Sequence, residues 1–215
     1  MIVGLVGPKT SGKTTVFEMT QNKVPGIEEV MLAKQLKRVC AIMLAADSLE
    51  FNSQKYKETN ICLTLNRVDI DFILDAFNLD QYREVCYKLH VGKTLHSPRE
   101  LMQYVGTNIL RSIRPSIHIE YATSKIVPGR NYMVTDIRFF DELLHFQTAF
   151  PQFKAYYLYR PEAEKVAKLP DAHESEKNTL WLREHVNVVL LNTGSLEELE
   201  EEVDRFIIPN FRKGE

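Results

Sequence analysis

The sequence of 215 residues predicts an α/β fold in three layers, with helices on both sides of a central parallel sheet. The chain opens on a short apolar run, Ile2–Val6, which ends at a glycine and is typical of a buried parallel strand. Three later apolar runs, residues 132–135, 155–159 and 187–191, have the length of strands. Segments of helical spacing separate these runs, and strands that alternate with helices form parallel sheets with right-handed crossovers.

Two helices and a loop are expected after the first strand. A glycine-rich turn leads into residues 12–20, for which we expect the first helix. Apolar side chains recur at helical spacing over residues 28–46, which predicts one long helix there. Residues 47–58 are polar and predict a loop.

The centre of the chain is predicted to be mostly helical over residues 67–113. Ser97 is followed by a proline and, three residues on, by Glu100, so a capping box begins a helix there. The helical block over residues 66–130 does not fit a simple alternation, and we expect it to cap the edge of the sheet at which a ligand binds. The last helix, from Leu196 on, has one apolar face, and its acidic run is the solvated face.

Composition and charge exclude several classes of protein. With 27 Lys and Arg against 29 Asp and Glu, the net charge is −2, whereas a protein that coats nucleic acid neutralises many phosphates. The sequence has no run of about 18 apolar residues, so we expect no membrane span. Three cysteines without a C-x-x-C pair favour reduced thiols in the cytoplasm. The length favours one domain over residues 1–215, with an insertion.

Residues 7–14 fit the phosphate-binding pattern G-x-x-x-x-G-K-[ST], the P-loop, between a predicted strand and a predicted helix. Its two glycines adopt backbone conformations closed to other residues, so the loop can aim its amide N–H groups at an anion. In this pattern Lys13 reaches the β- and γ-phosphates of ATP, and the Thr14 hydroxyl ligates Mg²⁺. The predicted ATP-binding residues of the loop are Gly7, Thr10, Ser11, Gly12, Lys13, Thr14 and Thr15.

Three classes of P-loop protein compete: a kinase acting on a small molecule, a GTPase switch, and a motor or nucleic-acid translocase. Residues 66–69, Asn-Arg-Val-Asp, resemble the guanine-reading pattern N-K-x-D, but arginine replaces the lysine and no D-x-x-G occurs in the chain. Asn66 is better interpreted as the cap of a helix that begins at Arg67. A translocase needs a larger chain or a basic track, which the charge of −2 disfavours.

A kinase requires cationic side chains that converge from loops over the sheet edge. Asp136 and Arg138 follow the predicted strand 132–135, at the carboxyl end where ligands bind in open α/β sheets. Asp136 could hold Mg²⁺ through water, and Arg138 could bridge the transferring phosphoryl group. Arg160 follows the strand 155–159 in the same way and opens a polar segment, residues 160–180, in which we expect a lid that excludes water.

Five further segments occur in the order and spacing of a known family: residues 32–37 (LAKQLK), 97–107 (SPRELMQYVGT), 134–139 (VTDIRF), 171–176 (DAHESE) and 192–199 (NTGSLEEL). With the P-loop, they make the chain resemble, nearly end to end, the deoxynucleoside monophosphate (dNMP) kinases of tailed bacteriophages. These enzymes are distant relatives of adenylate kinase and of the animal-type phosphomevalonate kinases. The resemblance implies a P-loop kinase fold with a helical nucleotide-binding and lid region.

The resemblance also implies the reaction and the roles of residues. ATP and a dNMP would give ADP and dNDP with Mg²⁺, in the cytoplasm, which for a phage protein is that of the host. The implied catalytic residues are Lys13, Arg138 and Arg160, and the implied metal ligands are Thr14 and Asp136. Thr193 and Gly194 would border the adenine of ATP. The dNMP would be bound by Lys34, Arg99, Gln103 and Arg111, with a helical acceptor-binding insertion at about residues 47–130.

Two alternatives stay open at this stage. One is a P-loop kinase of another phosphorylated small molecule, such as phosphomevalonate, and the other is a nucleotide-binding switch. The expected partners are small nucleotides, with no nucleic-acid polymer and no membrane. A homodimer stays open, as do the bases that are accepted.

Overall fold

The computed structural model describes residues 1–47, 51 and 53–211. The chain divides into two compact units. The sheet unit consists of Met1–Leu32 and Ala122–Glu215, and the helical unit consists of Ala33–Tyr121. The expectation of one kinase domain with an acceptor-binding insertion at about residues 47–130 and a lid at 160–180 stays a prediction.

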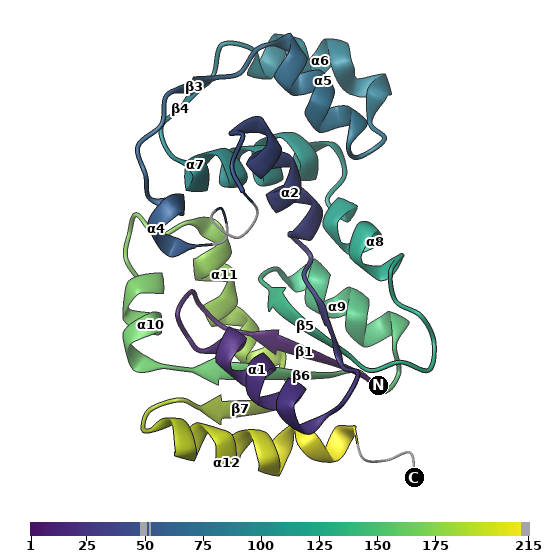
Figure 1. The fold of residues 1–215 in the computed structure, drawn as a ribbon, viewed down its shortest axis with the longest axis vertical. Helices are drawn as coiled ribbons and strands as arrows, with labels where there is room; N and C mark the ends of the chain where they lie inside the picture. Colours follow the sequence, from purple (N-terminus) through teal and green to yellow (C-terminus); the bar gives the residue numbers. More distant parts are fainter. Residues whose placement is uncertain (48–50, 52, 212–215) are drawn as a thin grey trace. The chain divides into compact units, whose positions relative to one another are not determined.

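The sheet unit is built on five parallel strands in the order β2-β5-β1-β6-β7, and Figure 1 labels four of them, β5, β1, β6 and β7. Their bounds are β1 (Ile2–Val6), β2 (Glu28–Val30), β5 (Tyr132–Ile137), β6 (Lys154–Tyr159) and β7 (Val188–Leu191). In the register of the central strand, Val3 lies between Met133 of β5 and Lys154 of β6. The predicted central parallel sheet is confirmed, and four of its strands lie where the apolar runs predict them.

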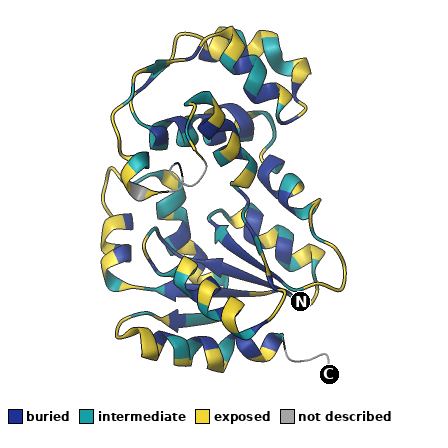
Figure 2. Cartoon of the chain, viewed as in Figure 1, coloured by how far each residue is buried: buried dark blue, intermediate teal, exposed yellow. Residues whose placement is uncertain are grey.

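Alternate side chains of β1, β5, β6 and β7 enter two different hydrophobic cores, as the period of two in a strand requires. On one face Val3 and Leu5 pack with α1 (Lys13–Lys23) and α12 (Leu196–Phe206). On the other face Ile2 and Val6 pack with α9 (Phe140–Ala149) and α11 (Glu174–Leu182). Figure 2 shows β1, β5 and β6 buried along most of their length. The predicted three layers are therefore confirmed.

The prediction of one long helix over residues 28–46 is wrong. The segment forms strand β2 and then, after a break, helix α2 (Lys34–Met43). β2 exists because it pairs with β5 at the edge of the sheet, with Glu28 opposite Tyr132 and Val30 opposite Val134. The pairing partners are about a hundred positions apart in the chain, so the helical spacing of nearby residues gives no sign of them. The tertiary contact overrides the local pattern, which corresponds to a helix only from α2 onward.

The sheet unit also contains the short helix α10 (Pro161–Ala167) and two single turns, η3 (Arg183–His185) and η4 (Ile208–Asn210). The helical unit ends, and the second segment of the sheet unit begins, within helix α8 (Ile117–Thr123). No helix in the described parts of the chain is both long enough and apolar enough to cross a membrane.

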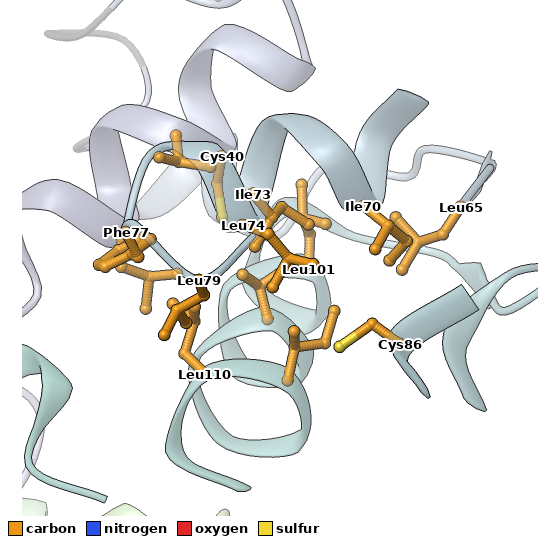
Figure 3. Close-up of a cluster of buried hydrophobic side chains, with 14 of the residues drawn as sticks. Cys40, Leu65, Ile70, Ile73, Leu74, Phe77, Leu79, Cys86, Leu101 and Leu110 are labelled. Atoms are coloured by element: carbon orange, nitrogen blue, oxygen red, sulfur yellow. The ribbon is translucent and has the colours of Figure 1, made fainter. Parts of the chain in front are cut away.

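Residues 67–113 of the helical unit are mostly helical, as predicted. Its elements are α2, α4 (Gln54–Lys57), α5 (Arg67–Asp75), η1 (Asp80–Tyr82), α6 (Arg83–His90), α7 (Pro98–Gln103) and the π-helix η2 (Tyr104–Arg111). Its core joins α2 to α5, α6, α7 and η2 through buried side chains that include Cys40, Ile73, Leu74 and Leu101 (Figure 3).

Two local predictions in this unit need correction. A small antiparallel pair, β3 (Leu63–Thr64) with β4 (Thr94–Leu95), interrupts the region predicted to be helical. The loop predicted at residues 47–58 contains the short helix α4. The Ser53 hydroxyl caps this helix by accepting a hydrogen bond from one of its backbone N–H groups. The part of that prediction at residues 48–50 and 52 lies outside the described residues.

Both predicted helix caps in this unit form. The Asn66 side chain accepts hydrogen bonds from the amides of Val68 and Asp69 at the start of α5, so residues 66–69 act as a capping box. The Ser97 hydroxyl accepts from the Glu100 amide at 3.1 Å and begins α7. Glu100 in turn accepts from the amide of His96 at 2.7 Å, one residue before the partner that the pattern predicts.

Candidate active site

The phosphate loop joins the carboxyl end of β1 to the first turn of α1 and requires both of its glycines. Gly7 has φ +149° and Gly12 has φ +107°, in the range that side chains rarely adopt. A Cβ on Gly12 would lie 2.5 Å from Nδ2 of Asn192, and one on Gly7 would lie 2.7 Å from Oγ of Ser11. The backbone conformation and the close packing at both glycines therefore exclude larger residues, and the loop ends at a helix N-terminus, where anions bind.

Lys13 is the first residue of α1, and its ammonium lies among oxygen atoms of the loop. Nζ donates to the carbonyl of Gly7 at 2.5 Å and to that of Pro8 at 2.7 Å. Burial, and to a smaller extent the nearby Arg138, lower the pKa of Lys13 to about 7 against the opposing effect of Glu176 and Asp136. Lys13 of the loop therefore lies near enough to Asp136 and Arg138, at the carboxyl end of β5, for their charges to act on it.

Asp136, the predicted metal carboxylate, lies near the carboxyl end of β5 and is oriented by β2. Its Oδ1 accepts a hydrogen bond from the amide of Leu32 at 2.7 Å, just past the end of β2. The neighbouring Thr135 donates from its hydroxyl to Oε1 of Glu29 at 2.6 Å. The strand that the sequence did not predict therefore sets the orientation of a predicted site residue.

Hydroxyl and carboxylate oxygens are the donors that Mg²⁺ prefers, so Thr14, exposed in α1, and Asp136 are chemically suited to it. Within residues 1–47, 51 and 53–211, no group of three or more His, Cys, Asp or Glu side chains could hold a metal ion by itself. Mg²⁺ usually takes one or two protein ligands and completes its shell with substrate phosphates and water.

Arg138, which follows the end of β5, is held by two carboxylates. Its guanidinium forms an ion pair with Glu176, in the first turn of α11. Its backbone amide donates to Oε2 of the buried Glu142 at 2.8 Å, and the Phe139 amide does the same at 3.0 Å. Glu142 thus fixes the chain at Arg138 while Glu176 fixes its side chain.

Glu176 is a site residue that the sequence analysis did not predict. Besides the pair with Arg138, its Oε2 accepts from the backbone amide of Lys9 in the phosphate loop at 2.6 Å. Burial opposes the charge on Glu176, but Arg138, the Lys9 amide and Lys13 outweigh it and hold its pKa below the usual value. The only available signal was its place in the segment 171–176, which gives no indication that the side chain reaches residue 9.

Arg160 and the turn after β7 border a pocket of about 380 Å³ beside the phosphate loop. Nη1 of Arg160 donates to the Thr10 carbonyl at 3.4 Å, so this predicted catalytic arginine lies against the loop. The pocket is lined by Gly12, Thr15, Arg160, Glu162, Asn192, Thr193, Gly194, Leu196 and Leu199. Four predicted ATP-binding residues therefore share one pocket, whose volume suits a small molecule.

The four predicted dNMP-binding residues all belong to the helical unit. Lys34 begins α2, Gln103 ends α7, and Arg111 ends η2. Arg99, in the first turn of α7, pairs through Nε with Glu58 at 2.7 Å. Because α7 runs directly into η2, Arg99 and Arg111 stand up to roughly 18 Å apart along one helix axis. Their role in binding an acceptor stays a prediction.

The sheet order and the glycine-dependent loop together define an α/β fold of the P-loop kinase type. No family model matches the chain. A relative from Acanthamoeba polyphaga mimivirus, named "Putative deoxynucleotide monophosphate kinase", is 25% identical over 218 residues, which are 94% of this chain and 94% of the relative. The bacteriophage origin implied by the resemblance stays a prediction.

Two solved structures show similarity over nearly the full chain. Dephospho-CoA kinase from Campylobacter jejuni is 12% identical with a TM-score of 0.41, covering 97% of this chain and 96% of that one. The protein TT1252 from Thermus thermophilus is 17% identical with a TM-score of 0.38, covering 95% of each chain.

Proposed function

We propose that the protein is a dNMP kinase, which transfers the γ-phosphoryl group of ATP to a dNMP and yields ADP and dNDP. The observation that carries the proposal is that Arg138, at the carboxyl end of β5, is linked through Glu176 to the backbone amide of Lys9 in the phosphate loop. The 25% identity to a mimivirus protein named as a kinase of this type, over 94% of both chains, supports the choice of acceptor.

In the proposed reaction an oxygen of the acceptor phosphate attacks the γ-phosphorus of ATP. The bond between that phosphorus and the β–γ bridging oxygen breaks, and ADP leaves with the electron pair. The acceptor phosphate is already ionised at neutral pH, so no general base is required. The task of the protein is to position both phosphates and to stabilise the charge that develops between them.

The residues of the sheet unit have distinct roles in this proposal. The loop amides and Lys13 hold the ATP phosphates, while Arg138 and Arg160 neutralise charge on the transferred group. The pocket beside Thr193 and Gly194 receives the nucleoside of ATP. Thr14 and Asp136 would hold Mg²⁺, which when bound neutralises phosphate charge.

The residues of the helical unit are proposed to bind the acceptor. Gln103 offers amide hydrogen bonds that suit a base edge, and Lys34, Arg99 and Arg111 offer charge for a phosphate. Arg99 and Arg111 are too far apart along one helix for a single phosphate to contact both. They would therefore contact different parts of the acceptor or act at different stages.

A coupled assay of ADP release, with Mg²⁺-ATP and a panel of dNMPs, ribonucleoside monophosphates and phosphomevalonate, tests the proposal. We expect turnover with at least one dNMP well above the rate without acceptor, and none with the Lys13→Ala variant purified in parallel. Turnover with phosphomevalonate alone would show that the protein is a kinase with a different acceptor. Slow ADP release that no acceptor accelerates would contradict the kinase and favour a nucleotide switch.

A further inference from the structure

The Glu176 carboxylate bridges two hydrogen-bond donors that come from distant parts of the sheet unit. One oxygen accepts the backbone N–H of Lys9, and the other pairs with the guanidinium of Arg138. The side chains of Glu176 and Arg138 are 18% and 30% exposed, so the pair is largely shielded from water. The ammonium of Lys13 also acts on this carboxylate and stabilises its charge.

These donors are of the kinds that bind phosphate. Backbone N–H groups of a phosphate loop and an arginine guanidinium both donate charge-assisted hydrogen bonds to anionic oxygens. A carboxylate and a terminal phosphate offer similar oxygen atoms to such donors. The N–H of Lys9 has a single hydrogen, however, so it cannot serve both fully at the same time.

We propose that the Glu176 carboxylate lies in the subsite of the terminal phosphate of a bound nucleoside triphosphate and competes with that phosphate for Lys9 N–H and Arg138. The inference rests on the proposed function, because it takes the phosphate loop to be the ATP site. A diphosphate has no terminal phosphate at this place and leaves the contact intact. The competition therefore weakens triphosphate binding selectively, and Arg138 becomes available to phosphate only when a triphosphate displaces Glu176.

The helix dipole alone does not account for Glu176. Acidic residues are favoured in the first turn of any helix, and Glu174 also occupies that turn of α11. Glu174 is exposed, and among the described residues its side chain forms no hydrogen bond or ion pair with the phosphate loop, whereas Glu176 reaches a loop residue 167 positions away. Glu174 is therefore a matched control of the same charge, helix and turn.

Equilibrium titration of the full chain with Mg²⁺ and either ADP or the non-hydrolysable analogue β,γ-imido-ATP tests the inference. We expect Glu176→Gln to bind β,γ-imido-ATP about tenfold more tightly, the scale of a charge-assisted hydrogen bond partly offset by solvent. Its affinity for ADP should change by less than about twofold on the same reasoning. Glu174→Gln should change neither affinity, and Glu176→Ala should tighten β,γ-imido-ATP binding at least as much as Glu176→Gln.

Three results would overturn the inference. Unchanged or weaker binding of β,γ-imido-ATP by both Glu176 variants would make Glu176 a residue that positions Arg138 for phosphate. If the Glu176 variants bound ADP and β,γ-imido-ATP more tightly to the same degree, or if Glu174→Gln had the same effect, the change in affinity would be a general effect of charge. If the folded wild-type protein binds neither nucleotide, the proposed function itself fails. The first two results, by contrast, contradict only the inference on Glu176.

Discussion

The side-chain amide of Asn192 donates a hydrogen bond to the backbone carbonyl of Ser11 at 2.8 Å, which ties the end of β7 to the phosphate loop. The backbone amide of Asn192 is itself fixed by the carbonyl of Tyr159 at 2.9 Å. The same side chain fills the space in which a Cβ on Gly12 would lie. The turn of the loop is therefore braced by a residue 181 positions later in the chain.

Asn192→Ala should loosen the loop without removing any group that we propose to contact the transferred phosphoryl group. We expect the KM for ATP to rise about fivefold and kcat to change less, since one hydrogen bond contributes about 1 kcal/mol. Steady-state kinetics at saturating acceptor measure both constants. Asn178→Ala, which alters an amide bonded to the Glu174 carbonyl, serves as the control. An unchanged KM for ATP would show that the brace does not matter for binding.

Lys13→Ala should abolish phosphoryl transfer and leave the protein folded. The ammonium is held at a lowered pKa by burial, so its removal takes away a charge that burial disfavours rather than a stabilising core contact. We expect turnover to fall by at least about a thousandfold, at the upper end of the effect of one charge-stabilising group. Thermal unfolding checks the fold. A folded variant with wild-type turnover would contradict the role given to Lys13.

Arg138→Ala should lower kcat by roughly two orders of magnitude or more, because it removes a proposed charge clamp on the transferred group. The backbone there stays anchored, since Glu142 binds the Arg138 amide and not its side chain. Arg130→Ala is a suitable control, because Arg130 is exposed and pairs with Glu28 at the surface. Single-turnover measurements with both variants give the rate of the chemical step. Equal rates for the two variants would place Arg138 outside the site.

His90 should make the helical unit sensitive to mild acid. Burial lowers the pKa of His90, so between its folded value and the unfolded value of about 6.5 the unfolded chain binds the additional proton. The free energy of unfolding should therefore fall as the pH drops below about 6.5 and be unaffected by this group at higher pH. Urea unfolding at pH 7.5 and 5.5 measures the difference between the two values.

His90→Gln should reduce this loss of stability in acid, while His96→Gln, at an exposed residue of the same unit, should not. The amide can retain a hydrogen bond to the Tyr104 hydroxyl, which lies 3.0 Å from Nδ1 of His90. The same acid dependence in wild type and in His90→Gln would show that the burial of His90 has no effect on stability.

The parts of the fold that follow from local patterns could be predicted from the sequence. β1, the phosphate loop and α1 form one continuous segment with its own glycine and apolar pattern. Asp136 and Arg138 could be placed at the carboxyl end of a strand because parallel strands bring their ends to one edge. The caps at Asn66 and Ser97 depend only on residues within three positions.

The parts that the sequence did not predict depend on pairing between distant segments. β2 has three residues and forms only against β5, and the two-residue strands β3 and β4 join positions about thirty residues apart. Glu176 reaches the loop only because α11 packs on the sheet, which no local pattern encodes. Long-range contacts therefore account for both the wrong helix at residues 28–46 and the missed site residue.

Transfer of an isotopic label tests the central claim most directly. The protein is incubated with Mg²⁺ and ATP labelled in the γ-phosphoryl group, together with the dNMP that is most active in the panel, and the products are separated. We predict that the label appears in the dNDP, and that chelation of Mg²⁺ or Lys13→Ala prevents this. Label found only in inorganic phosphate, at a rate independent of the dNMP, would contradict the assignment as a kinase of nucleoside monophosphates.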